Sequence, residues 1–433
     1  MTIEIRTVDL TRDPATRSRA AVRSAIPDPE VFALAASIVA EVAAGGDGAL
    51  SRLSSLHGGG LADGSHLVPS EDIEKAPGTI APALLSALEE AITHVTAVHR
   101  PQRPTDAVVT PLDGVTVERI WSPLSSVGVY VPGGRGLYPS SLIMGVVPAR
   151  IAGVERIVVA TPAGPDGSID PIVLAAACLL DVDTVHAMGG AQAVAALAHG
   201  TETIERVDKI VGPGGPWVTA AKLAVFGSCG IDLPAGPSEA AVVVHGAADP
   251  ALVAADVMCQ AEHGAESAVT LIVTDPSMAS DVLAEIDSAL PRLERRELIA
   301  AALGNHGLVA IARDLAQALE FANEWAPEHL SIHAPDARGA ADSVPNAGSV
   351  FIGTWTPEAA GDYATGANHV LPTGGLARSY GPLGVEDFGS WRQVQTLTRD
   401  GLTALAPTIL AMARAEGFTA HANSVTARLE RTP

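Results

Sequence analysis

The sequence predicts an α/β protein with two domains built on parallel β-sheets and with helical extensions at both ends. The chain has 433 residues, which is more than one hydrophobic core usually serves. Hydrophobic residues make up 47% of it, enough to fill two cores. From residue 126 onward, short β-like runs alternate with helical segments, and this alternation is typical of parallel sheets covered by helices on both faces.

Residues 1–125 are predicted to be mainly helical and to pack on the core. Segments 27–59 and 81–104 have apolar residues at helical spacing and contain Gly or Pro stop signals. Residues 126–235 are predicted to form the first Rossmann-like domain. Its expected strands are 126–131, 156–162, 184–190 and 208–215, and its expected helices are 140–153, 170–180, 191–200 and 216–227.

Residues 236–380 are predicted to form a second Rossmann-like domain. Its expected strands are 239–246, 268–275, 306–312, 329–335 and 347–353, with helices at 249–264 and 315–326. Residues 381–433 are expected to be a helical C-terminal tail. This tail is too short to bury a core of its own, so it must pack on another surface.

Composition excludes several classes of function. The net charge of −22 argues against a nucleic-acid backbone or an anionic membrane as partner. Three widely spaced cysteines without a CxxC motif exclude a disulfide framework and a thiolate zinc site. No apolar run is expected to reach the roughly 18 residues of a membrane helix, and the polar N-terminus does not resemble a signal peptide. A cytoplasmic protein is therefore expected.

Four glycine-rich turns are candidates for ligand binding. They read PGGRG, MGGAQA, VGPGG and AGPSE, and sites on parallel sheets usually lie where a strand turns into a helix. None is the full GxGxxG or GxxxxGK[ST] fingerprint. Each turn alone is better explained as a tight connection between a strand and a helix, but four in succession favour a nucleotide site.

Ionisable side chains gather in the second half of the chain. In the motif QAEHG, Gln260 and His263 are three residues apart and would share one face of a helix end, where they could hold a metal, bind a substrate or cap the last turn. Glu328 and His329 stand beside a predicted strand. Further candidates occur in Gly-rich or helical segments: Asp362, Tyr363, His369, Glu416 and His421. Together they fit a zinc site with an acid/base pair beside it.

The ordered motifs GVYVPGG, MGGAQA, AGPSE, QAEHG, PEHL, GDYATGANHVLPT and AHANSV resemble those of the histidinol dehydrogenases. This resemblance covers nearly the whole chain. It implies a zinc- and NAD-dependent enzyme that oxidises L-histidinol to L-histidine through a bound aldehyde, at the end of histidine biosynthesis. It also implies one Zn²⁺ per subunit and a homodimer in which the tail of one chain completes the site of the other.

The resemblance assigns roles to individual residues. The zinc ligands would be Gln260, His263, Asp362 and His421. Glu328 and His329 would be the catalytic pair. The substrate would contact the four ligands together with Ser238, His329, His369 and Glu416. NAD would contact Tyr130 and Gln192, and also position 215, where Gly215 stands in place of the asparagine that the family usually has.

Three other functions remain open at this stage. The same scaffold could oxidise another small polar alcohol, because a fold alone does not determine a substrate. A zinc hydrolase would use Glu328 to activate water and would need no NAD, which the four glycine turns disfavour. A non-catalytic relative that only binds a ligand is disfavoured because the expected ligands and the catalytic pair are all present.

Overall fold

The computed structural model describes residues 3–12, 19–21, 23–134 and 136–431. The chain forms two compact units, each made of two segments. Unit 1 comprises Met1–Gln102 and Ser125–Phe388, and unit 2 comprises Arg103–Leu124 and Gly389–Pro433. The division into four sequence regions remains a prediction.

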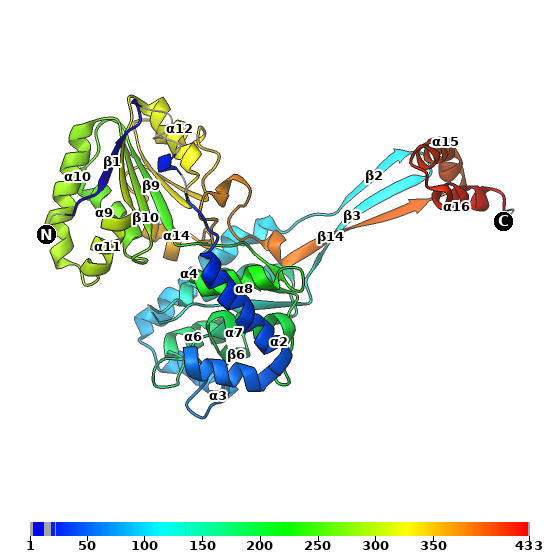
Figure 1. Ribbon diagram of the computed structural model, residues 1–433, viewed down its shortest axis with the longest axis horizontal. Helices are drawn as coiled ribbons and strands as arrows, with labels where there is room; N and C mark the ends of the chain where they lie inside the picture. Colours follow the sequence, from blue (N-terminus) through cyan, green and yellow to red (C-terminus); the bar gives the residue numbers. More distant parts are fainter. Residues whose placement is uncertain (1–2, 13–18, 22, 135, 432–433) are drawn as a thin grey trace. The chain divides into compact units, whose positions relative to one another are not determined.

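The first sheet of unit 1 has five parallel strands in the order β6-β5-β4-β7-β8. Its edge strand β6 is labelled in Figure 1. The strands are β4 (Ser126–Tyr130), β5 (Arg156–Thr161), β6 (Thr184–Ala187), β7 (Lys209–Val211) and β8 (Gly230–Ile231). Every residue of β4 is buried, as expected for a central strand covered on both faces. The predicted parallel arrangement of the first domain is confirmed.

Helices cover this sheet, and all of them except α3 lie in segments that were predicted to be helical. They are α2 (Pro29–His57), α3 (Ser70–Lys75), α4 (Pro82–His99), α5 (Pro139–Ala152), α6 (Pro171–Leu179), α7 (Gly190–His199) and α8 (Pro216–Val225). Most begin with proline, whose missing N–H costs nothing in the first turn. At α6 the Asp170 side chain also accepts a hydrogen bond from the N–H of Ile172.

Helix α2 corrects one expectation from the sequence. By length and composition it could cross a membrane, since it has 29 residues and an 18-residue window of mean hydropathy 1.4. However, it contacts α7 and α8, and Val39, Val42 and Leu50 lie in the core of the first sheet. A positive φ of 52° at Gly46 also kinks it. We interpret α2 as a core-packing helix.

The second sheet of unit 1 has six parallel strands in the order β1-β11-β10-β9-β12-β13. The strands are β1 (Arg6–Asp9), β9 (Glu239–Val244), β10 (Ala268–Val273), β11 (Gly307–Ile311), β12 (His329–His333) and β13 (Ser349–Ile352). Strand β1 was not predicted. Strand β1 lies at the edge of the sheet, and only one of its four residues is buried. Its sequence therefore lacks a clear apolar pattern.

In the described part of the chain, six α-helices accompany this sheet. They are α9 (Pro250–Ala261), α10 (Pro276–Ala289), α11 (Arg296–His306), α12 (Leu315–Trp325), α13 (Ala337–Ala341) and α14 (Glu358–Tyr363). Helices α9 and α12 were expected. Short 3₁₀ turns complete unit 1: Ala76–Gly78, Arg100–Gln102, Leu290–Arg292, Leu376–Arg378 and Val385–Phe388.

Unit 2 is an antiparallel three-stranded sheet followed by two helices. The sheet order is β14-β3-β2, and the elements are β2 (Ala107–Leu112), β3 (Val115–Pro123), β14 (Gly389–Leu397), α15 (Arg399–Ala415) and α16 (Thr419–Leu429). The tail is therefore not wholly helical. Strand β14 is mostly exposed and polar, so it shows no alternation of apolar residues. The dipeptide Asp113–Gly114 could have predicted the hairpin of β2 and β3, because Asp-Gly favours two-residue hairpin turns. The φ angle of Gly114 is 79°, as such a turn requires.

Candidate active site

The candidate catalytic residues meet at the amino edge of the second sheet, not at its carboxyl edge. His329 is the first residue of β12 and Glu239 is the first residue of β9. The motif AGPSE leads into β9, so it differs from the three glycine turns of the first sheet, which follow strands β4, β6 and β7. The expectation that all four turns lie at carboxyl ends is wrong for AGPSE. The last turn of α9 meets this edge, since Gln260 contacts His329 there.

Gln260 lies in the last turn of α9 and is fully buried. Helix α9 ends at Ala261 with Glu262 as its C-cap, so His263 stands in the turn just after the helix. This corrects the expectation that both side chains project from the helix. The chain remains tightly wound, since the N–H of His263 lies 3.3 Å from the carbonyl oxygen of Gln260. The two side chains therefore still reach the same region.

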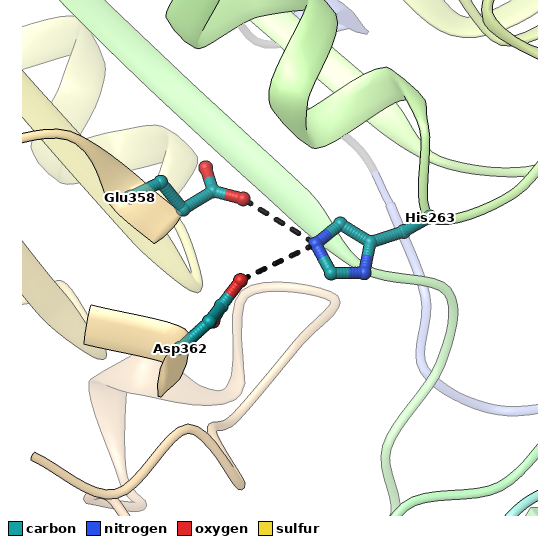
Figure 2. Close-up of side chains that lie close together, drawn as sticks. All are labelled: His263, Glu358 and Asp362. Atoms are coloured by element: carbon teal, nitrogen blue, oxygen red, sulfur yellow. Dashed lines mark ion pairs between the residues drawn. The ribbon is translucent and has the colours of Figure 1, made fainter. Parts of the chain in front are cut away.

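His263 faces two carboxylates of α14 (Figure 2). Its Nε2 lies 3.5 Å from Oε1 of Glu358 and 3.7 Å from Oδ2 of Asp362. Glu358 and Asp362 are four residues apart and thus share one face of α14. Both carboxylates are buried, while the His263 side chain is 34% exposed. The cluster opens to solvent on the histidine side.

The environment of His263 favours positive charge. Desolvation lowers the pKa of His263, but the hydrogen bond and charge of Glu358 and the charge of Asp362 raise it above its ordinary value overall. Burial raises the pKa of Glu358, although His263 opposes this. Among the described residues, the ion pairs of Glu358 and Asp362 are all with histidines. A cation would therefore relieve an unfavourable concentration of buried negative charge.

The Gln260 amide is oriented by its neighbours. Its nitrogen faces Glu358 and His329, so it donates to the two Glu358 oxygens at 3.1 and 3.3 Å and to Nδ1 of His329 at 3.1 Å. Its oxygen accepts from the N–H of Glu239 at 3.2 Å. Amide oxygen, imidazole nitrogen and carboxylate oxygens are all donors that zinc accepts. The residues therefore fit a metal ion.

Glu328 and His329 lie directly beside this cluster and are both buried. Nδ1 of His329 lies 3.1 Å from Gln260 and 3.9 Å from Oε2 of Glu328. Desolvation raises the pKa of Glu328 well above its usual value and lowers the pKa of His329 to about 4. Near neutral pH the imidazole is therefore uncharged and able to accept a proton.

Backbone and salt-bridge contacts position this pair. The N–H of Glu239 donates to Oε2 of Glu328 at 2.8 Å. The Glu239 carboxylate in turn accepts two hydrogen bonds from Arg23, each at 2.6 Å, and the guanidinium lies 3.4 Å from the Trp325 ring centroid. Bidentate pairing of this kind resists rotation of either side chain. The start of β9 is thereby held against Glu328.

The structure brings His369 to the site and leaves Ser238 at its border. Nδ1 of His369 lies 2.9 Å from the backbone oxygen of Asp362 and 4.0 Å from its Oδ1. Desolvation lowers the pKa of His369. Ser238 is half-buried immediately before β9, and the exposed Tyr363 follows Asp362 at the end of α14.

Glu358 was not identified from the sequence. The available signal was its position four residues before Asp362 in PEAAGDY, which places two carboxylates on one helical face. The sequence around it reads as a loop, so no helical face was assigned. The contact between Glu239 and Glu328 was also missed, since it depends on the pairing of β9 with β12.

The residues expected to contact NAD lie at the carboxyl edge of the first sheet. The Tyr130 hydroxyl accepts a hydrogen bond from the N–H of Gly190 at 3.1 Å, and Gln192 donates to the Gly58 carbonyl at 3.2 Å. Both side chains are buried, so they shape the glycine turns in this structure. Gly215 is the exposed N-cap of α8. Arg135 of the PGGRG turn lies outside the described residues.

Glu416 and His421 both belong to unit 2. Glu416 is the C-cap of α15 and His421 lies in α16, where its ring packs against Phe418 with centroids 5.1 Å apart. Both are exposed. Their place in the metal and substrate site remains a prediction.

Comparison with known proteins identifies the family. The sequence model described as "Histidinol dehydrogenase" matches residues 22–429. The chain belongs to the histidinol dehydrogenase family. It is 41% identical to the histidinol dehydrogenase of Methanothermobacter thermautotrophicus, with 94% of this chain and 95% of that protein covered. It is 48% identical to that of Haloarcula marismortui, over 82% of this chain and 84% of the relative.

A solved histidinol dehydrogenase has the same fold. The structure from Elizabethkingia anophelis matches with a TM-score of 0.93 and 32% identity, covering 99% of both chains. The agreement extends over the two parallel sheets and the terminal elements. This confirms the fold class and the family resemblance that the ordered motifs predict.

Proposed function

We propose that this protein is a zinc-dependent histidinol dehydrogenase that oxidises L-histidinol to L-histidine with two NAD, the final steps of histidine biosynthesis. The observation that carries the proposal is the arrangement of His263, Glu358 and Asp362 around one point, with Glu328 and His329 directly beside it. A metal-binding cluster and a buried acid/base pair are what two oxidations and an intervening hydration require.

Zinc, when bound, would orient the amino alcohol and stabilise developing negative charge. Gln260, His263 and Asp362 would hold it, with His421 as the fourth ligand that the family pattern implies. His329 takes the hydroxyl proton while hydride leaves for the nicotinamide, because burial keeps its imidazole neutral. The first product, an aldehyde, stays bound and is protected from side reactions.

Glu328 would act on the second oxidation. Burial raises the pKa of the Glu328 carboxyl well above its usual value, and a carboxylate of higher pKa is a stronger base. It removes a proton from the water that adds to the aldehyde, and the resulting hydrate gives up the second hydride. Its Oε2 is already held by the Glu239 N–H, so the carboxylate needs little reorganisation.

The glycine turns of the first sheet would bind NAD. The N-terminus of α8 begins at Gly215, and helix N-termini attract phosphate. Tyr130 and Gln192 would support this surface by fixing the turns around them. The chain would work as a cytoplasmic homodimer in which Glu416 and His421 of one subunit complete the site of the other.

A direct assay tests the proposal. NADH formation is followed at 340 nm with histidinol and with a panel of other amino alcohols and diols, before and after metal chelation. We expect two NADH per histidinol, loss of activity on chelation and recovery with zinc. Turnover of another alcohol but not histidinol would indicate a different dehydrogenase. No NADH with any alcohol would refute a dehydrogenase function.

A further inference from the structure

A buried ion pair holds the glycine turn that follows β7. Lys222 of α8 pairs with Oδ1 of Asp232, and the two side chains are 3% and 1% exposed. Oδ2 of Asp232 accepts a hydrogen bond from the N–H of Gly212 at 2.8 Å, and Nζ of Lys222 donates to the Gly212 carbonyl at 3.0 Å. The two partners of one ion pair therefore hold both polar backbone groups of a single glycine.

Gly212 begins the turn 212–215 at the carboxyl edge of the first sheet. Its φ is 113°, a conformation that favours glycine, and a Cβ atom there would collide with the carbonyl oxygen of Tyr130. The Tyr130 hydroxyl in turn accepts a hydrogen bond from the N–H of Gly190 in the neighbouring glycine turn. Holding Gly212 therefore fixes one turn against the residue that supports another.

Stability alone does not explain this pair. Taking two charges out of water costs free energy that their attraction often fails to return, and apolar side chains of similar volume can replace such pairs without loss. The ammonium and carboxylate provide something that apolar side chains lack, which is a donor and an acceptor directed at the two backbone groups of Gly212. The pair is suited to fixing the shape of the turn.

We propose that Lys222 and Asp232 are positioning residues for NAD, because they hold the turn 212–215 in its binding shape before the cofactor arrives. The inference rests on the proposed use of NAD and adds two residues that need not touch the cofactor. A turn that is already ordered loses little conformational entropy when NAD binds, so more of the contact energy appears as affinity.

The segment between Asp232 and β9 has anchors of its own. The Thr219 hydroxyl donates to the Ala235 carbonyl, and the N–H of Gly236 donates to Oγ1 of Thr373 at 2.6 Å. The approach to the substrate side is therefore held by contacts that do not involve the ion pair. Loss of the pair should accordingly weaken binding of the cofactor and leave binding of metal and substrate in place.

The test uses the double variant Lys222→Met with Asp232→Leu, which removes both contacts to Gly212 without leaving a buried charge unpaired. Lys209→Met is the matched control. Lys209 begins β7 at the opposite end of the same strand, where its Nζ donates to the Asp387 carbonyl at 2.6 Å. Urea titration checks the folding of each protein, and calorimetric titration measures its Kd for NAD and for zinc.

We expect the double variant to unfold near the wild-type urea midpoint but to bind NAD at least about tenfold more weakly, roughly the cost of ordering one backbone residue during binding. The KM for NAD should rise in parallel. Zinc affinity, the KM for histidinol and kcat at saturating NAD should stay within about twofold of wild type, the pattern of lost ground-state binding. Lys209→Met should match the wild type in every one of these measurements.

Hydrogen exchange in the wild type gives a second measurement, which decides the question if the double variant does not fold. The N–H of Gly212 should be strongly protected before NAD is added, and NAD should slow its exchange by less than about threefold. Rapid exchange that NAD slows strongly would mean that the cofactor itself orders the turn, and it would overturn the inference.

Two results with the double variant would also overturn it. One is a Kd for NAD within about twofold of wild type, and the other is an equal weakening of NAD and zinc binding, which indicates a general structural defect. Failure of the proposed function looks different, because the wild type itself would then bind no NAD. If the wild type binds NAD and the folded double variant binds it equally well, only the positioning role is wrong.

Discussion

Replacing Gly215 by asparagine should tighten NAD binding. Gly215 has φ −70° and ψ 179°, a conformation that any residue adopts without strain. A Cβ atom built there meets nothing within 4 Å, and the residue is exposed. The turn therefore has room for the asparagine side chain that the family usually places here. Nothing in the fold around Gly215 requires glycine.

The size of the effect follows from one hydrogen bond. If the asparagine amide contacts the nucleotide, the gain is about 1 kcal/mol, which lowers the Kd for NAD about fivefold. Asparagine is also a better N-cap than glycine by a few tenths of a kcal/mol, so α8 should be slightly stabilised. Both changes favour the variant, and neither demands rearrangement of α8.

Calorimetric titration with NAD measures the Kd, and thermal melting measures the stability. Gly215→Ala is the matched control because it adds a Cβ without an amide, and it should leave the Kd unchanged and slightly lower the melting temperature. An asparagine variant that melts normally but binds NAD no better than the wild type would refute the reasoning. The turn would then be shaped around glycine for another reason.

Three further outcomes are expected. Glu328→Gln should slow aldehyde oxidation more than alcohol oxidation in single-turnover assays, and equal losses in both steps would contradict the division of roles. Co-refolding of His263→Ala with His421→Ala should restore NADH formation up to about a quarter of wild type, because one of the two sites in each mixed dimer carries neither change. If mixed dimers form but are inactive, His263 and His421 belong to a site built within one subunit. Lys222→Met should lower the free energy of unfolding by about 3–5 kcal/mol in urea titrations, since it leaves Asp232 buried without its charge partner, and adding Asp232→Leu should recover most of the loss. A single variant as stable as the wild type would mean that this pair does not stabilise the fold.

The sequence by itself determined the two parallel sheets and most of the candidate chemistry. Central strands such as β4 and β9 are buried at every residue and are apolar after their first residue, so they can be recognised without knowing their neighbours. Asp, Gly and Pro mark many of the helix ends through local geometry alone. The motifs QAEHG, PEHL and GDYA likewise contain Gln260, His263, Glu328, His329 and Asp362 in short segments, where residue type and order are sufficient to suggest a metal and an acid/base pair.

Only the tertiary structure decided where these residues meet. The exposed strand β14 pairs with β3 across more than 260 residues of sequence, and β1 pairs with β11 at the far edge of the second sheet. Such edge pairings rest on backbone hydrogen bonds, which leave no mark in the side-chain pattern. The site lies at the amino edge because Gln260, in the last turn of α9, meets the first residue of β12 there. That same meeting brings Glu358 to His263, a contact set by packing between distant segments and therefore not visible in either segment alone.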